Sequence, residues 1–493
     1  MKKLNPLPLF LLVGTIAFGQ NTTVSRLSEG DIYQIAAAQT GIYKLSYSFL
    51  KDELRLPVDG LNPDQLQLLG IPGGPLPFYS EAPRTDDLAQ LPVYVEDGGD
   101  GSFGPGDYLL FYGEGASVWA YEDGKYRWRQ NPFDNNNYYF LKIGAGQGAR
   151  ISAQASLSST AHTTREFDGR IHFEQEERNL MHEWNKGQGS GRNWYGDHFK
   201  VTREYTYESL FDFPNLITTE PVRVIAQAAL RSRSSSAFSL SIDGQNLESS
   251  PASGLSHIGG ASDATSTYAR TARLDGELLL SSEKTDVTIR YPHASGAGDE
   301  SEGWVDYIQL FARRALRYKG PQMSFRDAES LNHSTTTFEI ADCPAGTVVW
   351  DVTDAQSPRQ QETSRSGNTL QFGRPTDVLR EFVVFNPASQ LLQPEAMGRI
   401  ENQNIHSISS ADMVICYHPD FQEAANRLAQ HRAAENGLEG VLVTPRQIFN
   451  EFSGGRAEPT AIRDFCRMVY GRDSTFRYLL LLGDASFDWK DTY

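Results

Sequence analysis

Short runs of alternating or β-branched residues, separated by glycine-rich and polar turns, make up most of the chain before residue 394. Runs of this kind predict β-strands. Before residue 168 we expect strands at 31–36, 41–46, 91–96, 108–112 and 138–143. From 168 to 317 four further runs follow without helical spacing between them, which predicts an antiparallel β-sandwich; they are 222–231, 237–242, 285–291 and 304–313. The stretch 249–266, rich in Ser, Gly and Ala, is expected to be a loop. A smaller β unit follows, with strands at 335–340, 347–352, 369–372 and 381–386.

The pattern changes after Pro394. Three short apolar runs alternate with segments whose apolar residues recur at helical spacing; the runs are 412–417, 441–444 and 478–482. This alternation predicts a parallel sheet with right-handed crossovers. The last run, YLLLL, is expected to be a strand covered on both faces.

The predicted fold class is therefore multidomain β plus α/β. We expect a signal peptide at 1–19, a β-rich domain at 20–167, a β-sandwich at 168–317, a small β domain at 318–395, and the start of an α/β domain at 396–493. The signal peptide rests on Lys2 and Lys3, on the apolar core that follows them, and on the small–x–small site that ends at Gly19. The chain is expected to be exported.

Composition narrows the classes of function. The formal net charge is −17, which argues against a nucleic-acid partner, because phosphate binding relies on basic surfaces. Three cysteines, an odd number, exclude a disulfide-rich scaffold. Cys343 lies in the small β unit, Cys416 in an apolar run and Cys466 on the apolar side of a helix, so all three are expected to react poorly as thiols.

A turn-rich loop, DGGDGSFGPGD, carries three carboxylates. Asp97, Asp100 and Asp107 could together bind Ca²⁺, which favours clustered carboxylate oxygens. Their spacing does not fit an EF-hand, and a plain hairpin loop with glycines at positive φ is the alternative.

The run EWNKGQGSGRNWYGDHF is polar, aromatic and rich in glycine. Arg192, Trp194, Tyr195 and Asp197 are of the types that bind sugars, because aromatic faces and charged tips suit polyols. A structured loop capped by aromatic residues is the alternative.

The last strand is followed by Gly483, Asp484 and, four residues later, Asp488. Ligands and catalytic groups of open α/β sheets gather at the carboxyl ends of the strands, so these positions are expected at a functional edge. No chemical role is assigned to them. Buttressing the loop after the strand is as good an interpretation as any chemical one.

Several stretches, in order, resemble the gingipain-type cysteine peptidases of family C25, and more closely the type IX secretion sortases of Bacteroidetes. They are GIYKLSYSFL, DGSFGPGDYLLFYGEG, GRNWYGDHF, WVDYIQLFARR, ENQNIHSI, IFNEFSGG and YLLLLGDASFD. The resemblance implies a caspase-like fold and a Cys–His dyad. It also implies removal of the C-terminal sorting domains of secreted cargo, with possible joining of the new end to a surface glycolipid. The implied location is the outer membrane or cell surface, and the implied partner besides cargo is an outer-membrane β-barrel protein.

The chain departs from the family at the dyad. The family's histidine precedes a glycine and, like its cysteine, lies beyond the GDASFD element, whereas no histidine here precedes a glycine. Cys416 and His418 lie two residues apart, but their strand is expected to be buried. No catalytic residue is therefore assigned, and the active site is expected beyond Tyr493. The alternative function is an exported non-catalytic β-scaffold that binds a glycan or a partner protein.

Overall fold

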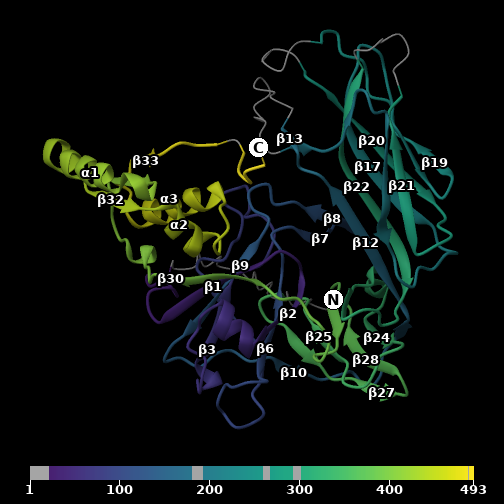
Figure 1. Ribbon diagram of the computed structural model, residues 1–493, viewed down its shortest axis with the longest axis horizontal. Helices are drawn as coiled ribbons and strands as arrows, with labels where there is room; N and C mark the ends of the chain where they lie inside the picture. Colours follow the sequence, from purple (N-terminus) through teal and green to yellow (C-terminus); the bar gives the residue numbers. More distant parts are fainter. Residues whose placement is uncertain (1–21, 180–192, 259–266, 293–300, 487, 493) are drawn as a thin grey trace, which may run out of the picture.

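A computed structural model describes residues 22–179, 193–258, 267–292, 301–486 and 488–492. The expected signal peptide and Arg192 lie outside these residues. Strand-rich units form most of the molecule, and the helices of the C-terminal part gather at one end of it (Figure 1). Among the described residues, none of the helices combines the length and the apolar character that a membrane crossing requires.

The N-terminal unit is built on a five-stranded antiparallel sheet in the order β30-β1-β9-β3-β4. Its strands are β1 (Asp31–Ala37), β3 (Leu66–Gly70), β4 (Ala89–Leu91), β9 (Asn137–Ile143) and β30 (Glu395–Ile400). A second sheet packs its apolar face against the first and contains β2 (Gly41–Ser46), β5 (Tyr94–Glu96) and β6 (Tyr108–Gly113). The run expected as one strand at 91–96 is divided between β4 and β5, because Pro92 cannot donate to a ladder. A separate hairpin pairs β7 (Val118–Glu122) with β8 (Lys125–Arg129).

The predicted antiparallel sandwich is confirmed. One sheet has the order β12-β22-β17-β20, with β15 beside β22, and the other has the order β16-β21-β18-β19. The largest apolar cluster, including Phe211, Leu240 and Ile308, is formed by residues of both sheets. The first sheet contains β12 (Glu166–Glu174), β15 (His198–Phe199), β17 (Val222–Arg231), β20 (Arg270–Leu278) and β22 (Glu302–Ala315), and the second contains β16 (Glu204–Asp212), β18 (Ser239–Ile242), β19 (Gln245–Glu248) and β21 (Lys284–Arg290).

Two small sheets form the next unit, and they cross the expected boundaries. Their strands are β23 (Gln322–Phe325), β24 (Thr335–Ile340), β25 (Val348–Asp351), β26 (Arg359–Gln361), β27 (Ser364–Ser366), β28 (Thr369–Pro375) and β29 (Phe382–Phe385). Two strands from before residue 168, β10 (Ser152–Gln154) and β11 (His162–Thr164), pair in parallel with β26 and β24. In turn β30, from the start of the expected α/β domain, completes the N-terminal sheet beside β1.

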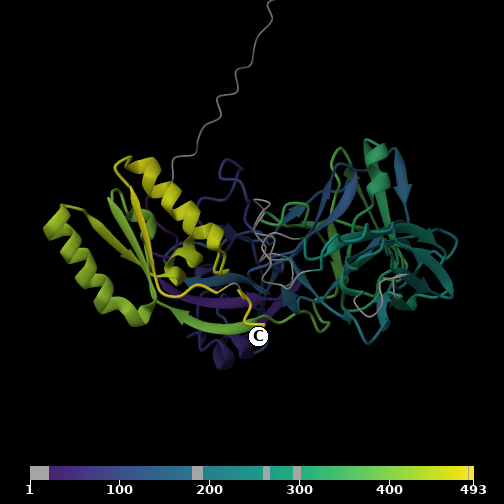
Figure 2. The ribbon, with the colours of Figure 1, turned by 90° about the horizontal axis from the view of Figure 1, so that it is seen from above.

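The C-terminal unit has the predicted alternation of strands and helices. Its elements are β31 (Met413–Tyr417), α1 (Gln422–Asn436), β32 (Gly440–Val443), α2 (Pro445–Phe452), α3 (Pro459–Arg472) and β33 (Tyr478–Leu482). The three strands are parallel, in the order β32-β31-β33. Helix α1 covers one face, and α2 with α3 covers the other (Figure 2). Gly437 ends α1 with φ of 64°, and Thr444 begins α2 with a capping box.

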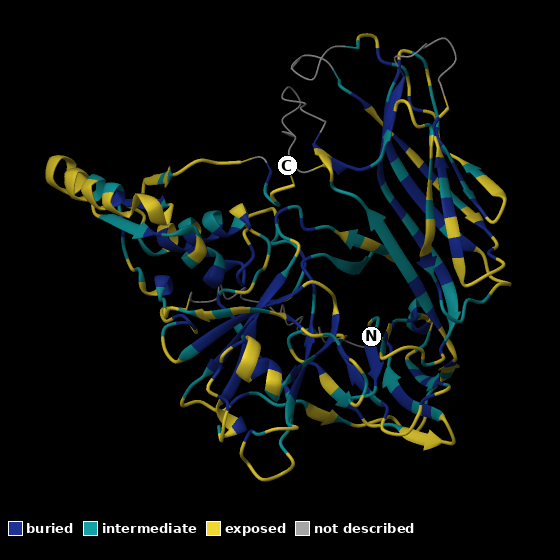
Figure 3. Cartoon of the chain, viewed as in Figure 1, coloured by how far each residue is buried: buried dark blue, intermediate teal, exposed yellow. Residues whose placement is uncertain are grey.

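The expectation that the strand at 478–482 is covered on both faces is wrong. β33 is the edge strand, and none of its five residues is buried, so residues on both faces reach solvent. Figure 3 colours the exposed and intermediate residues of this part of the chain. Leu479 and Leu481 are 43% and 56% exposed. They stand on the same face as Val414 and Cys416, where α2 and α3 pack over β31 but leave β33 open. A short apolar run does not distinguish a central strand from an edge strand.

Candidate functional site

The carboxyl edge of the three-stranded parallel sheet brings together two of the positions singled out in the sequence. His418 follows β31, and Gly483 follows β33. The backbone N–H of His418 donates to the carbonyl of Leu482 at 3.0 Å, and a Cβ on Gly483 would lie 3.6 Å from that of His418. His418 and Asp484 are both exposed at this edge, so polar side chains there are open to a ligand.

Asp488 has a different environment from Asp484. It is buried, and its backbone N–H donates to the Ser486 hydroxyl at 3.0 Å. The next two residues contact the β-rich part of the chain. The ring of Trp489 lies 4.5 Å from that of Phe133, and Lys490 forms an ion pair with Glu176 at 2.5 Å. The segment after β33 is therefore held against the β-rich units.

All three cysteines lie in surroundings that suppress thiolate formation. Burial raises the pKa of Cys343, Cys416 and Cys466 to about 11 in each case. Cys416 is buried in the apolar cluster beneath α2 and α3, whereas His418 is exposed at the sheet edge. Among the described residues, no cysteine is therefore placed as an accessible nucleophile beside a histidine base.

The loop at 97–107 joins β5 to β6, which pair antiparallel, so the hairpin interpretation fits the structure. Asp97, Asp100 and Asp107 each accept from a backbone N–H of their own loop, at 3.0, 2.9 and 2.7 Å. The described residues contain no group of three or more His, Cys, Asp or Glu side chains that could hold a metal ion. The geometry gives no support to a calcium site in this loop.

The aromatic residues of the run at 183–199 have packing roles in the described part of the chain. Trp194 and Tyr195 form β14 (Trp194–Tyr195), which pairs with β13 (Arg178–Asn179), and both are buried. Tyr195 belongs to a cluster with Trp304. Asp197 accepts from the hydroxyl of Tyr207 at 2.8 Å. The faces of Trp194 and Tyr195 are therefore not available to a sugar.

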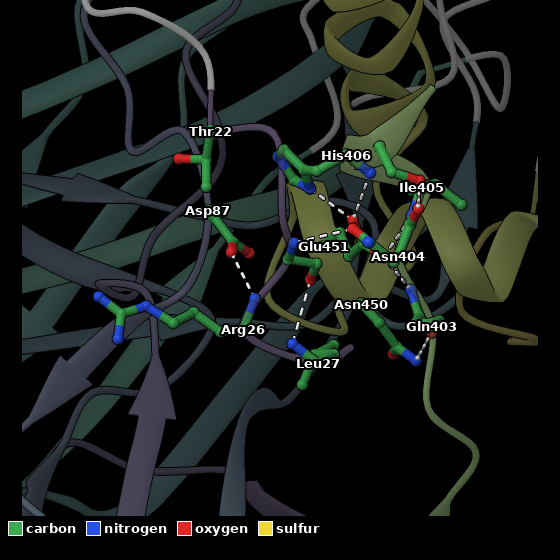
Figure 4. Close-up of polar contacts among 12 residues, drawn as sticks. Thr22, Arg26, Leu27, Asp87, Gln403, Asn404, Ile405, His406, Asn450 and Glu451 are labelled. Atoms are coloured by element: carbon green, nitrogen blue, oxygen red, sulfur yellow. Dashed lines mark hydrogen bonds and ion pairs between the residues drawn. The ribbon is translucent and has the colours of Figure 1, made fainter. Parts of the chain in front are cut away.

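A buried histidine–carboxylate pair that the sequence did not predict anchors the C-terminal unit (Figure 4). Nδ1 of His406 bonds a carboxylate oxygen of Glu451, and Nε2 lies 3.1 Å from the carbonyl oxygen of Asp86. The backbone N–H groups of Ile405 and His406 also donate to Glu451, at 2.9 and 3.0 Å. The His406 ring stacks on that of Phe452 with an interplanar angle of 2°. His406 belongs to the motif ENQNIHSI and Glu451 to the motif IFNEFSGG. The resemblance of both motifs to the peptidase family is the sequence signal that could have identified the pair.

Comparison with known proteins supports the resemblance found in the sequence. Residues 406–493 match the model of peptidase family C25. The crystal structure of dimeric latent PorU from Porphyromonas gingivalis matches with a TM-score of 0.80 and 24% identity, over 96% of this chain. This chain covers 43% of the length of that PorU chain. CBM35 from Cellvibrio japonicus Abf62 matches with a TM-score of only 0.19 and 14% identity, over 30% of this chain and 97% of that chain. No curated protein matches the sequence. The chain is thus PorU-like in fold, and its residues 406–493 match peptidase family C25.

Proposed function

We propose that this chain is part of a PorU-like cysteine peptidase. That peptidase removes the C-terminal sorting domains of secreted cargo and joins the new ends to a surface glycolipid. The observation that carries the proposal is the structural match to PorU over 96% of the chain. The C25 model match at residues 406–493 supports the peptidase class independently. In this proposal the chain is exported and acts at the outer membrane, beside a β-barrel partner of the type IX system.

The described residues suit a scaffold better than a thiol centre. Peptide cleavage by a thiol needs a thiolate and a nearby general base. Cys343, Cys416 and Cys466 are shielded and have raised pKa values, so none of them is the proposed nucleophile. The chain offers instead a parallel sheet whose unit is joined to the N-terminal β-rich unit by buried polar contacts, in which His406 contacts Asp86 and Glu458 contacts Asn131. The carboxyl edge of this sheet is open at His418 and Asp484.

Gene deletion in the native host tests this proposal. Without the gene, secreted cargo should keep its sorting domains, which mass spectrometry of surface proteins would detect. Restoring the gene with Cys416→Ala should restore processing, because that thiol takes no part in the chemistry. Cargo that matures normally without the gene would overturn the proposal. Loss of processing by Cys416→Ala, with the protein present and folded, would overturn the exclusion of Cys416.

Export can be tested separately. The positive residues and the small–x–small site predict a mature N-terminus near Gln20. N-terminal sequencing of protein isolated from the host envelope checks this, and recovery of an intact Met1 would contradict it.

A further inference from the structure

The outer face of the first sandwich sheet carries a groove of about 710 Å³. Its floor is formed by β12, β22, β17 and β20, and its wall is the β7–β8 hairpin of the preceding unit, which approaches that sheet in Figure 1. Glu174 and Tyr307 stand opposite each other on β12 and β22, and the next pair on the same face of the sheet is His172 and Gln309. The groove therefore presents rows of polar and aromatic side chains across adjacent strands.

A β-bulge in the central strand directs a carboxyl group into this groove. Gln227 of β17 pairs with Tyr307 of β22, but Ala228 pairs with Val305, so Asp306 is an extra residue without a partner in the register. Such bulges redirect side chains and are frequent near functional sites. Asp306 is buried and lines the groove, and its Oδ2 accepts from the Gln227 amide at 2.5 Å. Among the described residues, its other carboxyl oxygen has no hydrogen-bond partner.

A second carboxyl group lies in the same row at the end of a hydrogen-bonded chain. The Gln309 amide donates to Nδ1 of His172 at 3.0 Å, and Nε2 of His172 lies 2.9 Å from Oε2 of Glu174. Burial lowers the pKa of His172 to about 3, so the ring is neutral and its single proton lies on Nε2. Burial also raises the pKa of Glu174 to about 8 and of Asp306 to about 7. Near neutral pH both carboxyl groups hold a proton for much of the time, so each can donate and accept a hydrogen bond.

Aromatic rings provide the apolar part of the groove. Trp128 stacks on His172 with a centroid distance of 4.9 Å, Tyr121 and Tyr126 line the wall, and Tyr307 lines the floor. The guanidinium groups on the floor strands are neutralised by neighbouring carboxylates. Arg223 pairs with Asp275 at 2.8 Å, Arg313 pairs with Asp168 at 2.6 Å, and Arg273 lies 4.0 Å from Asp275.

We propose that this groove binds a neutral saccharide. Aromatic faces pack against the C–H faces of a sugar ring, while amides and protonated carboxyl groups match hydroxyls, which both donate and accept. An anionic ligand is disfavoured, because the arginines on the floor of the groove are already paired with Asp275 and Asp168. A metal ion is disfavoured, because the described residues contain no cluster of three ligating side chains. This binding is independent of the proposed peptidase function.

Isothermal titration calorimetry with cellotetraose, xylotetraose and mannotetraose as probes tests the inference, and tri-galacturonate serves as the anionic comparison. At least one neutral probe should bind, and Trp128→Ala and Asp306→Ala should each weaken binding at least about tenfold. Tyr470→Ala, which removes an aromatic ring 58% exposed on α3, is the matched control and should leave binding unchanged.

Circular dichroism establishes that each variant is folded, and Gln309→Ala serves as a milder substitution if Asp306→Ala unfolds the sandwich. Absence of binding by every neutral probe would overturn the proposal. So would binding that survives both Trp128→Ala and either Asp306→Ala or Gln309→Ala, or tighter binding of tri-galacturonate than of any neutral probe.

Discussion

Arg456 and Glu458 form an ion pair that is shielded from solvent. Nε of Arg456 lies 2.6 Å from Oε1 of Glu458, and the two side chains are 1% and 0% exposed. Glu458 also accepts from the Asn131 amide at 3.0 Å and from the backbone N–H of Leu76 at 2.8 Å. Arg456 donates to the carbonyl of Pro72 at 3.2 Å. The loop between α2 and α3 is thereby joined to the N-terminal unit by buried charges that satisfy one another.

Removing one member of this pair should destabilise the protein strongly. Arg456→Met leaves Glu458 buried without its cation, and breaking such a pair costs about 3–5 kcal/mol. Urea unfolding monitored by tryptophan fluorescence measures the loss. Arg399→Met is the control, because the Arg399–Asp31 pair is about half exposed and should contribute less than about 1 kcal/mol. Equal effects of the two substitutions would show that burial does not set the strength of the first pair.

The His406–Glu451 pair should make stability depend on pH. Although burial alone would lower the pKa of His406, the hydrogen bond to Glu451 and the nearby Asp87 raise it above 6.5. Because the folded-state pKa is raised, the stabilisation is complete below about pH 6.5 and is lost as pH rises through the folded-state value. His172 has a lowered pKa and acts in the opposite direction, so a variant comparison is required.

The difference in unfolding free energy between the wild type and His406→Gln should therefore be larger at pH 5.5 than at pH 8.5. Chemical denaturation at the two pH values measures it. His431→Gln, at an exposed position on α1, should show no such pH-dependent difference. A difference for His406→Gln that is the same at both pH values would contradict the assigned direction.

Local patterns in the sequence predicted many of the strands and the alternation of strands and helices after Pro394, but they missed β12, β16 and β20 of the sandwich, and they did not predict distant pairings. The run 222–231 is the strand β17, and Gly437 ends α1, because alternation and glycine caps are local signals. The pairing of β30 with β1 joins residues more than 350 positions apart and leaves no mark in either segment. The bulge at Asp306 likewise depends on the neighbouring strand.

The sequence identified candidate site residues by their chemical type, but it did not predict which of them are exposed to solvent. Asp484 lies at the carboxyl edge of the sheet, as strand order required. Trp194 and Tyr195 have the composition of a recognition loop, yet tertiary packing buries both. The Glu451 partner of His406 is 45 residues away, and only the fold brings the two together.

The cysteines should be inert while the protein is folded. With pKa values raised to about 11, on the order of 10⁻³ or less of each thiol is thiolate at pH 7.5. Iodoacetamide at pH 7.5, followed by intact-mass analysis, should show no rapid modification of the native chain and three modified cysteines in urea. Rapid labelling of Cys416 in the native protein would mean that its cluster opens readily or that its thiol is activated.

In a chain of residues 1–493, the open edge of β33 should promote self-association. Its outer backbone groups have no strand partner among the described residues, and Leu479 and Leu481 project apolar side chains beside them. Unpaired edges with exposed apolar residues are templates for intermolecular pairing. Leu479→Lys together with Leu481→Lys should shift the protein toward monomer in concentration-dependent sedimentation velocity, because two charges oppose edge-to-edge contact. Val201→Lys is the matched control, since Val201 is 93% exposed in a different unit and lies outside any strand. If the double variant associates as strongly as the wild type, or if Val201→Lys disperses the protein equally well, the edge of β33 is not the contact surface.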